Sequence, residues 1–217
     1  MDRRTASRYE LPEVIPIFPL PGALLLPRGR LPLNIFEPRY LDMVDQALRT
    51  NRLIGMIQPC GGDPSRPDLF PIGCVGRLTS WSETGDGRFF ITLTGAARFK
   101  VVHELETNTP YRQVQACYKA FPADLQDCAD TNFDRARLAG SLKCYLKQHK
   151  IEADWTSIER APAEVLINSL AMICPFDVGE KQGLLEAPTL CERANMLMAL
   201  IEMATAKGTG EPGGTLQ

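Results

Sequence analysis

Few residues in this chain combine the types and the spacing that catalysis requires. His103 precedes Glu104, a pair in which a carboxylate could orient a general base. A working base also needs a nucleophile and a pocket, and this pair falls at the expected end of a strand, so a surface histidine is the better interpretation. Cys60 lies in a glycine-rich stretch without a histidine, lysine or helix start beside it, which favours an unreactive loop cysteine.

Other catalytic and ligand-binding patterns are also missing from the sequence. Ser141 and Lys143 are two residues apart, a spacing that does not bring side chains together on a helix. No glycine is followed by lysine, so there is no Walker A motif. Gly85 and Gly87 precede a strand and lack the third glycine of a dinucleotide-binding motif, so a hairpin turn explains them. The two histidines and seven cysteines show no zinc-ligand spacing. The sequence therefore predicts no catalytic, cofactor-binding or metal-binding residue.

Some side chains could instead form a recognition patch at the surface. Arg39 could belong to a recognition patch, but an arginine that pins a helix against a sheet is favoured, and the same holds for Arg98. Trp81 is either a core residue or an exposed anchor, and burial is expected because tryptophan is highly buried on average. The candidate recognition residues are Phe36, Glu37, Arg39, Tyr40, Trp81 and Arg98.

Composition indicates an ordinary globular protein. The 217 residues are 44% apolar and 23% charged, with a net charge of −2, which gives no electrostatic basis for binding nucleic acid. The amino terminus has no secretory signal, and no stretch approaches the ~18 apolar residues of a membrane span. The seven cysteines lie mostly in apolar settings, which is typical of reduced thiols in a cytoplasmic protein.

The first half of the chain reads as short strands with one helix. Pro38 has the backbone angle that a helix start needs, and Glu37 before it suits the positive end of the helix dipole. Gly95 is expected to interrupt a strand. Many short strands with turn signals between them favour a sheet closed into a barrel. The expected elements are strands at 14–18, 30–36, 53–57, 72–83, 88–93, 97–102 and 111–119, a helix at 39–49 and a loop at 60–67.

The second half reads as all-helical. Four segments resemble capping boxes, in which two side chains bond the exposed amides of a helix start: Thr131 with Asp134, Thr156 with Glu159, Asp177 with Glu180, and Thr189 with Glu192. The expected apolar faces are Phe133, Leu138, Leu142 and Tyr145; Val165, Leu166, Ser169, Leu170 and Ile173; and Leu190, Ala194, Leu197, Leu200, Ile201 and Ala204. The predicted domains are a barrel at 1–122, a helical bundle at 123–207 and a disordered tail at 208–217.

Four segments in the same order resemble the Lon protease amino-terminal (substrate-binding) domain family. The resemblance runs from about residue 12 to 205. Each motif alone is unspecific, but together they span both halves of the chain. They are the proline-leucine segment that ends in Phe36-Glu37-Pro38-Arg39-Tyr40, then Ile72-Gly73-Cys74-Val75-Gly76, then Asp86-Gly87-Arg88 with Leu93 to Phe99, and finally Glu180-Lys181-Gln182-Gly183-Leu184-Leu185-Glu186 with Glu192-Arg193.

The resemblance implies an α+β fold with a PUA-like β-barrel followed by an α-helical bundle. Full-length Lon adds ATPase and Ser-Lys protease modules, and neither has a counterpart in this sequence. The resemblance therefore implies a stand-alone, non-catalytic module that binds unfolded or degron-bearing polypeptide through apolar surface and the groove between the halves. A role as a protease adaptor is a further implication.

Two other functions remain open. PUA-like barrels also bind RNA, although the acidic balance of this chain argues against that. A small-molecule sensor, as in a distant relative of the family, ranks last because the zinc-bound ligand domain of that relative has no counterpart here.

Overall fold

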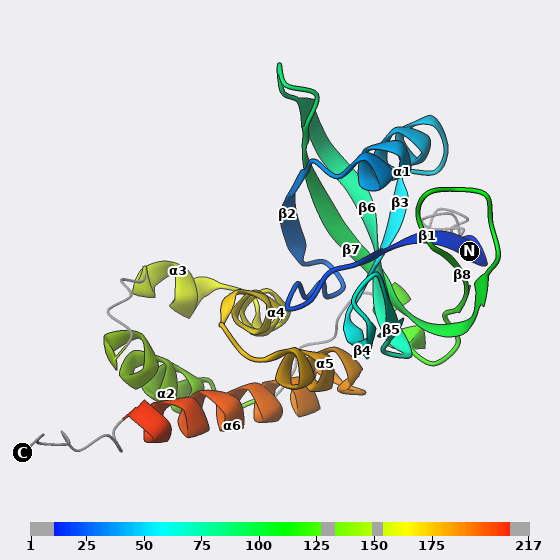
Figure 1. Cartoon of the computed structure of the whole chain (residues 1–217). Helices are drawn as coiled ribbons and strands as arrows, with labels where there is room; N and C mark the ends of the chain where they lie inside the picture. The colour runs from blue at the N-terminus through cyan, green and yellow to red at the C-terminus, as the bar shows by residue number, and fades with distance from the viewer. Residues whose placement is uncertain (1–10, 127–132, 149–153, 209–217) are drawn as a thin grey trace, which may run out of the picture.

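The computed structural model describes residues 11–126, 133–148 and 154–208, which form a β-rich part followed by a helical part (Figure 1). The β-rich part contains β1 (Val14–Pro19), β2 (Arg30–Ile35), α1 (Pro38–Arg49), β3 (Leu53–Ile57), β4 (Pro59–Asp63), β5 (Arg66–Leu69), β6 (Ile72–Glu83), β7 (Phe89–Leu105) and β8 (Gln113–Cys117). The helical part contains the 3-10 helix η1 (Pro122–Leu125), α2 (Arg135–Gln148), α3 (Trp155–Arg160), α4 (Ala163–Ile173), α5 (Val178–Glu186) and α6 (Leu190–Gly208).

The main sheet has the strand order β2-β7-β6-β3-β1-β8. Only the pairing of β1 with β3 is parallel among the described strands, and the long strand β7 pairs with β2, β6 and β8. In the described part of the chain β2 pairs with β7 alone, so the sheet keeps one open edge. Pro32 in this strand cannot donate a ladder hydrogen bond, which suits an edge position. The α+β class is confirmed, but the sheet is not a fully closed barrel.

Gly95 does not interrupt the sheet, contrary to the sequence-based expectation. Strand β7 continues through it for 17 residues. The reason for glycine is a close backbone crossing, because a Cβ at this position would lie 2.0 Å from the carbonyl oxygen of Leu26. The crossing is held by hydrogen bonds from Arg28 N to Gly95 O (2.8 Å) and from Gly95 N to Gly29 O (2.9 Å).

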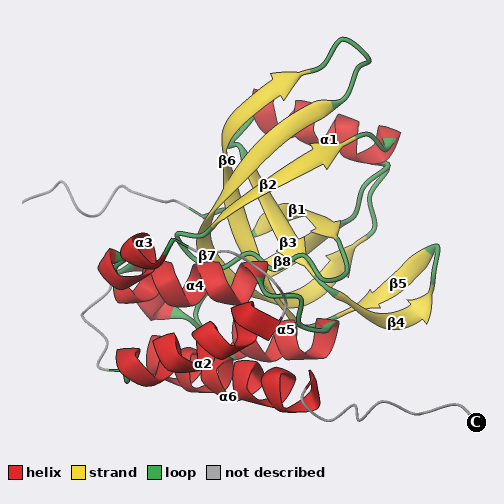
Figure 2. Cartoon of the chain, turned by 90° about the vertical axis from the view of Figure 1, so that its left-hand side faces the viewer, coloured by secondary structure: helices red, strands yellow, loops and turns green. Residues whose placement is uncertain are grey.

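The sequence predicted a loop at 60–67, but this segment is not a plain loop. It forms most of the hairpin of β4 and β5, which projects away from the main sheet (Figure 2). The turn formers Asp63, Pro64 and Ser65 make the tight connection, with the Asp63 carboxylate accepting a bond of 2.8 Å from Ser65 N. Gly61 and Gly62 have φ of 138° and 81°, values that allow the irregular register of the first strand.

Two of the predicted capping boxes are confirmed. At the start of α5, Glu180 N donates to the Asp177 carboxylate (2.7 Å), and Asp177 N donates to that of Glu180 (2.9 Å). At the start of α6, Glu192 N donates to the Thr189 hydroxyl (3.2 Å), and Thr189 N donates to the Glu192 carboxylate (3.0 Å). These local bonds fix where both helices begin.

The other two capping predictions fare differently. Thr156 lies inside α3, and the cap is Asp154, whose carboxylate accepts a bond of 3.2 Å from Ser157 N. The prediction for Thr156 is therefore wrong by two residues. Thr131 lies outside the described residues, but Asp134 accepts a bond of 2.9 Å from Arg137 N near the start of α2.

Helix α4 buries only part of the face that its sequence suggested. Leu166, Ile167 and Ala171 are buried in the helical part, whereas the side chains of Val165 and Ile173 are 52% and 79% exposed. The predicted face therefore combined residues that pack inward with residues that point outward. In α2 the prediction is better, because Leu138, Leu142 and Tyr145 are all buried against the rest of the bundle.

The division at residue 122 remains a prediction, although β8 ends before it and η1 begins at it. Most of the predicted tail at 208–217 lies outside the described residues. Within the part of the chain that is described, no helix is long and apolar enough to cross a membrane.

Candidate functional site

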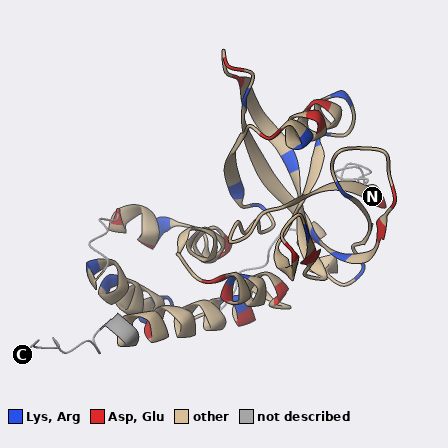
Figure 3. Cartoon of the chain, viewed as in Figure 1, with Lys and Arg blue, Asp and Glu red and all other residues tan. Residues whose placement is uncertain are grey.

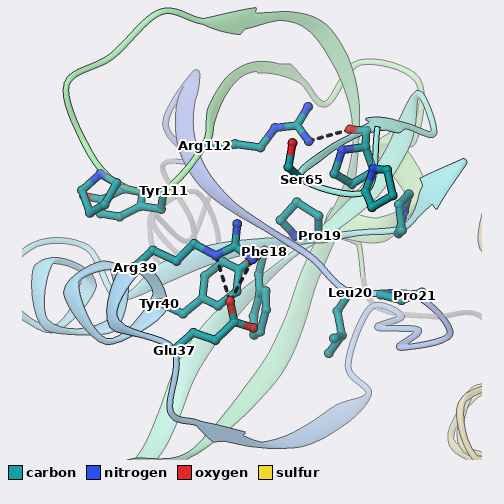
Figure 4. Close-up of a pocket in the computed structure, with 14 residues that line it drawn as sticks. Phe18, Pro19, Leu20, Pro21, Glu37, Arg39, Tyr40, Ser65, Tyr111 and Arg112 are labelled. Carbon is teal, nitrogen blue, oxygen red and sulfur yellow. Dashed lines mark hydrogen bonds and ion pairs between the residues drawn. The ribbon is translucent and has the colours of Figure 1, made fainter. Parts of the chain in front are cut away.

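A pocket of about 360 Å³ opens between four segments of the β-rich part (Figure 4). Its walls come from the end of β1, the start of α1, the β4–β5 hairpin and the segment before β8. Proline has a fixed backbone angle and no amide hydrogen, so such walls are rigid and poor in hydrogen-bond donors. We call this site the proline-lined pocket after Pro19, Pro21, Pro59, Pro64, Pro67 and Pro110.

The start of α1 brings the predicted residues Glu37, Arg39 and Tyr40 to one wall of this pocket (Figure 4). Arg39 Nε donates to Glu37 Oε2 at 3.0 Å, and the Arg39 guanidinium lies 4.6 Å from the centre of the Tyr40 ring. The Tyr40 ring packs 4.1 Å from that of Phe18, and its burial raises the pKa of the phenol. Arg39 therefore bonds within its own segment. The expectation that it pins α1 against the sheet is wrong.

Glu104 fixes the opposite wall of the pocket through Arg112. Arg112 donates to both carboxylate oxygens, at 2.9 and 2.6 Å, and to Pro67 O at 2.7 Å. Arg66 of the hairpin also donates to Glu104, at 2.9 Å. These bonds occupy the carboxylate next to His103, and His103 itself is exposed, as expected for a surface histidine.

Replacing Glu104 with glutamine is expected to lower the free energy of unfolding at neutral pH by about 1 kcal/mol, because a bidentate charged pair becomes a weaker neutral contact. Its hydrogen bonds with Arg112 hold the pKa of Glu104 below the ordinary 4.5. A carboxyl group whose pKa is lower in the folded state than in the unfolded state stabilises the protein at pH values above its unfolded-state pKa. That stabilisation is lost as the pH falls through the folded-state pKa. Urea unfolding at pH 6 and pH 3.5 should therefore show a smaller difference between the two proteins at the lower pH. A difference that stays constant with pH would contradict this role of Glu104.

Arg98 is a buried structural residue and not a surface contact. Its side chain is 3% exposed and forms two hydrogen bonds to Asp124, from Nε to Oδ2 (2.9 Å) and from Nη2 to Oδ1 (2.8 Å). Its Nη1 donates to Leu185 O (3.0 Å) and Ala187 O (2.6 Å) at the end of α5. The interpretation of Arg98 as an arginine that pins elements together is confirmed, and buried charge-assisted bonds of this kind hold the two parts in register.

Trp81 and Phe36 do not line the proline-lined pocket. Trp81 is 43% exposed, so the expectation of burial is wrong. From Thr79 onward β6 extends into the β6–β7 hairpin with exposed side chains, and the Arg52 guanidinium lies 4.8 Å from the centre of the Trp81 ring. Phe36 is 60% exposed between β2 and α1. The structure therefore brings three of the predicted residues to one pocket, whereas Phe36, Trp81 and Arg98 do not line it.

Helix α5 carries a polar network that the sequence analysis assigned no role. Gln182 accepts a bond from Gln58 Nε2 (3.1 Å) and donates through its own Nε2 to Ile72 O (3.1 Å). Lys181 Nζ donates to Gly22 O (2.7 Å). Both α5 side chains are buried, so they join the helical part to the β-rich part. In the sequence, the signal for this network was the adjacent polar pair Lys181-Gln182, which belongs to the family motif on this helix.

A second candidate surface lies where α4 meets the loop before β2. It is a groove of about 190 Å³, which we call the inter-half groove. Arg28 forms an ion pair with Glu164 across it, and Asn168 Nδ2 donates to Pro27 O at 3.0 Å. Val165 and Ile173 line it with mostly exposed side chains. The full lining is Arg28, Gly29, Arg30, Glu164, Val165, Asn168, Ser169, Met172 and Ile173.

Comparison with protein families matches residues 14–203 to the ATP-dependent protease La (LON) substrate-binding domain. The chain belongs to the Lon substrate-binding domain family. The matched range agrees with the extent of the motifs in the sequence.

Curated relatives of this Lon domain are much longer proteins. The Lon protease of Dictyoglomus thermophilum is 26% identical over 206 residues, which are 88% of this chain and 24% of that protein. Lon protease 2 of Myxococcus xanthus is 31% identical over 108 residues, which are 48% of this chain and 13% of that protein. The chain thus spans about a quarter or less of the length of these relatives.

Two solved structures share the fold of this Lon domain. A Lon N-terminal domain protein from Xanthomonas campestris matches with a TM-score of 0.57 and 22% identity, over 86% of this chain and 97% of that one. The N-terminal domain of Mycobacterium avium complex Lon protease matches with a TM-score of 0.58 and 12% identity, over 87% and 97%. At these identities the likeness shows the fold alone.

Proposed function

We propose that this Lon domain is a non-catalytic module that recognises polypeptide through the inter-half groove. The observation that carries the proposal is the exposure of Ile173 and Val165, at 79% and 52%, on the wall of that groove. Exposed apolar side chains grouped at a concave site are typical of binding surfaces. The family assignment supports the proposal, since the domain is described as substrate-binding.

Unfolded or degron-bearing segments are the proposed clients, because such segments expose the apolar side chains that folded proteins bury. Burying one isoleucine completely is worth about 1.5–3 kcal/mol, so a few contacts in the groove give binding that is weak and reversible. The proline-lined pocket would contribute a second contact area, with Arg39 and Glu37 at its wall. Delivery of clients to a protease is the proposed role of such a module.

Charge distribution favours polypeptide over nucleic acid as the partner. Figure 3 shows Lys and Arg interspersed with Asp and Glu in both halves. The net charge of −2 gives little attraction to a phosphate backbone. A PUA-like barrel remains our proposal for the β-rich part, supported by the pairing of β7 with both β6 and β8. A cytoplasmic location is proposed from the free thiols of the described cysteines.

Replacing Ile173 with serine is expected to weaken binding of an unfolded polypeptide about tenfold, because the variant removes the most exposed apolar contact of the groove. The measurement is a fluorescence anisotropy titration with labelled, permanently unfolded polypeptide. Met203→Ser is the matched control, since Met203 is 54% exposed on α6, outside the groove lining. Equal affinities of the Ile173 variant and the parent protein would contradict the proposal.

A further inference from the structure

We propose that the polypeptide is bound in extended form, as an added strand on the open edge of β2 beside the inter-half groove. This inference rests on the proposed function and specifies its binding mode. In strand addition, main-chain hydrogen bonds provide affinity and neighbouring pockets select the side chains. A free sheet edge has the donors and acceptors that such binding needs.

The direction of the backbone bonds shows which residues of β2 face the open edge. Gly29 O accepts from Gly95 N on β7, so the main chain of Gly29 faces inward. In an antiparallel pair the main-chain groups of successive residues alternate between the two sides. Arg30, Pro32 and Asn34 therefore direct their backbone groups outward, and all three residues are exposed. These three residues span about 13 Å of the edge, at ~3.3 Å per residue.

Pro32 limits what can bind to this edge. It has no amide hydrogen, so the outward donors are those of Arg30 and Asn34, and the outward acceptors are the carbonyl groups of all three residues. A proline in the middle of an edge strand is a recognised protection against continuous sheet extension. The edge therefore suits a short client segment better than an unlimited stack of copies.

The edge and the groove are continuous in the chain. Gly29 and Arg30 line the groove, and Arg30 is also the first residue of β2. A Cβ on Gly29 would lie 2.5 Å from Met172 Sδ, which shows how closely α4 approaches the start of the edge. A segment that pairs with β2 and continues past Arg30 reaches the exposed side chains of Val165 and Ile173.

Charge indicates the chemistry of the client. Arg30 is exposed on the groove wall and forms no ion pair with another described residue. Its neighbour Arg28, by contrast, is paired with Glu164. An extended segment that places a carboxylate near Arg30 and apolar side chains along α4 matches both features. We therefore assign the edge to extended segments in which apolar and acidic residues alternate.

The first test uses three labelled peptides of about ten residues in which isoleucine and glutamate alternate. One is unmodified, one is N-methylated on its isoleucine amides, and one on its glutamate amides. Strand addition uses the amides of one set, so the affinities of the two methylated isomers should differ by about tenfold. Equal affinities overturn strand addition but leave polypeptide recognition standing. No binding of the unmodified peptide overturns this proposal, whereas polypeptide recognition itself is decided by the titration with unfolded polypeptide.

The second test reverses the charge at the start of the edge. Arg30→Glu should weaken binding of the unmodified peptide about tenfold but leave unchanged the binding of a version with glutamine in place of glutamate, while the unfolding midpoint stays unchanged. Equal affinity of parent and variant for the acidic peptide overturns the assignment of Arg30. A second copy of this chain could also occupy the edge, and sedimentation velocity tests for it. A concentration-dependent dimer that the peptide does not dissociate assigns the edge to the second copy and overturns the proposal.

Discussion

Replacing Arg98 with methionine is expected to lower the free energy of unfolding by about 3–5 kcal/mol, a large part of the stability of an ordinary domain. The variant leaves the Asp124 carboxylate, 7% exposed, without its charged partner. It also leaves the carbonyl groups of Leu185 and Ala187 without their donor. Because these bonds join β7 to the end of α5, the loss should weaken the contact between the two halves.

Urea unfolding followed by circular dichroism measures this loss. Arg39→Met is the control, because Arg39 forms its ion pair with Glu37 at the surface, where the two side chains are 45% and 43% exposed. Exposed pairs contribute about 0–1 kcal/mol. If the two variants lose similar amounts, Arg98 does not have the structural role that its contacts indicate.

Replacing Gly95 with alanine is expected to destabilise the protein by about 3 kcal/mol, at the upper end of ordinary overpacking costs. The new Cβ would lie 2.0 Å from Leu26 O, and the obstructing atom is backbone, which cannot rotate away. Either β7 or the crossing segment at 26–29 has to move, and both hydrogen bonds of Gly95 to that segment would be strained. Thermal unfolding should show a clearly lowered midpoint.

Gly140→Ala provides a matched control for the loss of a glycine. Gly140 lies within α2, and a Cβ there has no atom within 4 Å. Alanine is favoured over glycine inside a helix by about 0.5–1 kcal/mol, so this variant should be slightly more stable than the parent. A destabilised Gly140 variant, or an unchanged Gly95 variant, would contradict the packing described here.

Local patterns predicted the elements of the fold well. The proline at the start of α1, the apolar run of β3 and the Asp177–Glu180 capping box each depend on neighbouring residues, so a single sequence is enough to detect them. The family motifs carried the remaining information on fold class. Prediction was poorer where distant segments meet. Nothing near Gly95 in the sequence reveals that residues 26–29 cross it.

The candidate sites show the same contrast between local features, which the sequence predicts, and contacts between distant segments, which it does not. Glu37, Arg39 and Tyr40 are close in sequence, so their shared position in the proline-lined pocket follows from α1. The exposed face of α4 did not follow, because Val165 and Ile173 are apolar and fit a buried helical pattern. Their exposure depends on how the β-rich part packs against α4, because this packing leaves the inter-half groove open. Trp81 was misjudged for a similar reason, since the length of the projecting β6–β7 hairpin decides its exposure.

The central claim is that this Lon domain recognises polypeptide. The most direct test is a pair of anisotropy titrations at physiological salt, one with a labelled, permanently unfolded polypeptide and one with a structured RNA of matched size. We expect saturable binding of the polypeptide and none of the RNA. Binding of the RNA alone, weakening steeply as salt is raised, would contradict the account and indicate a nucleic-acid-binding module.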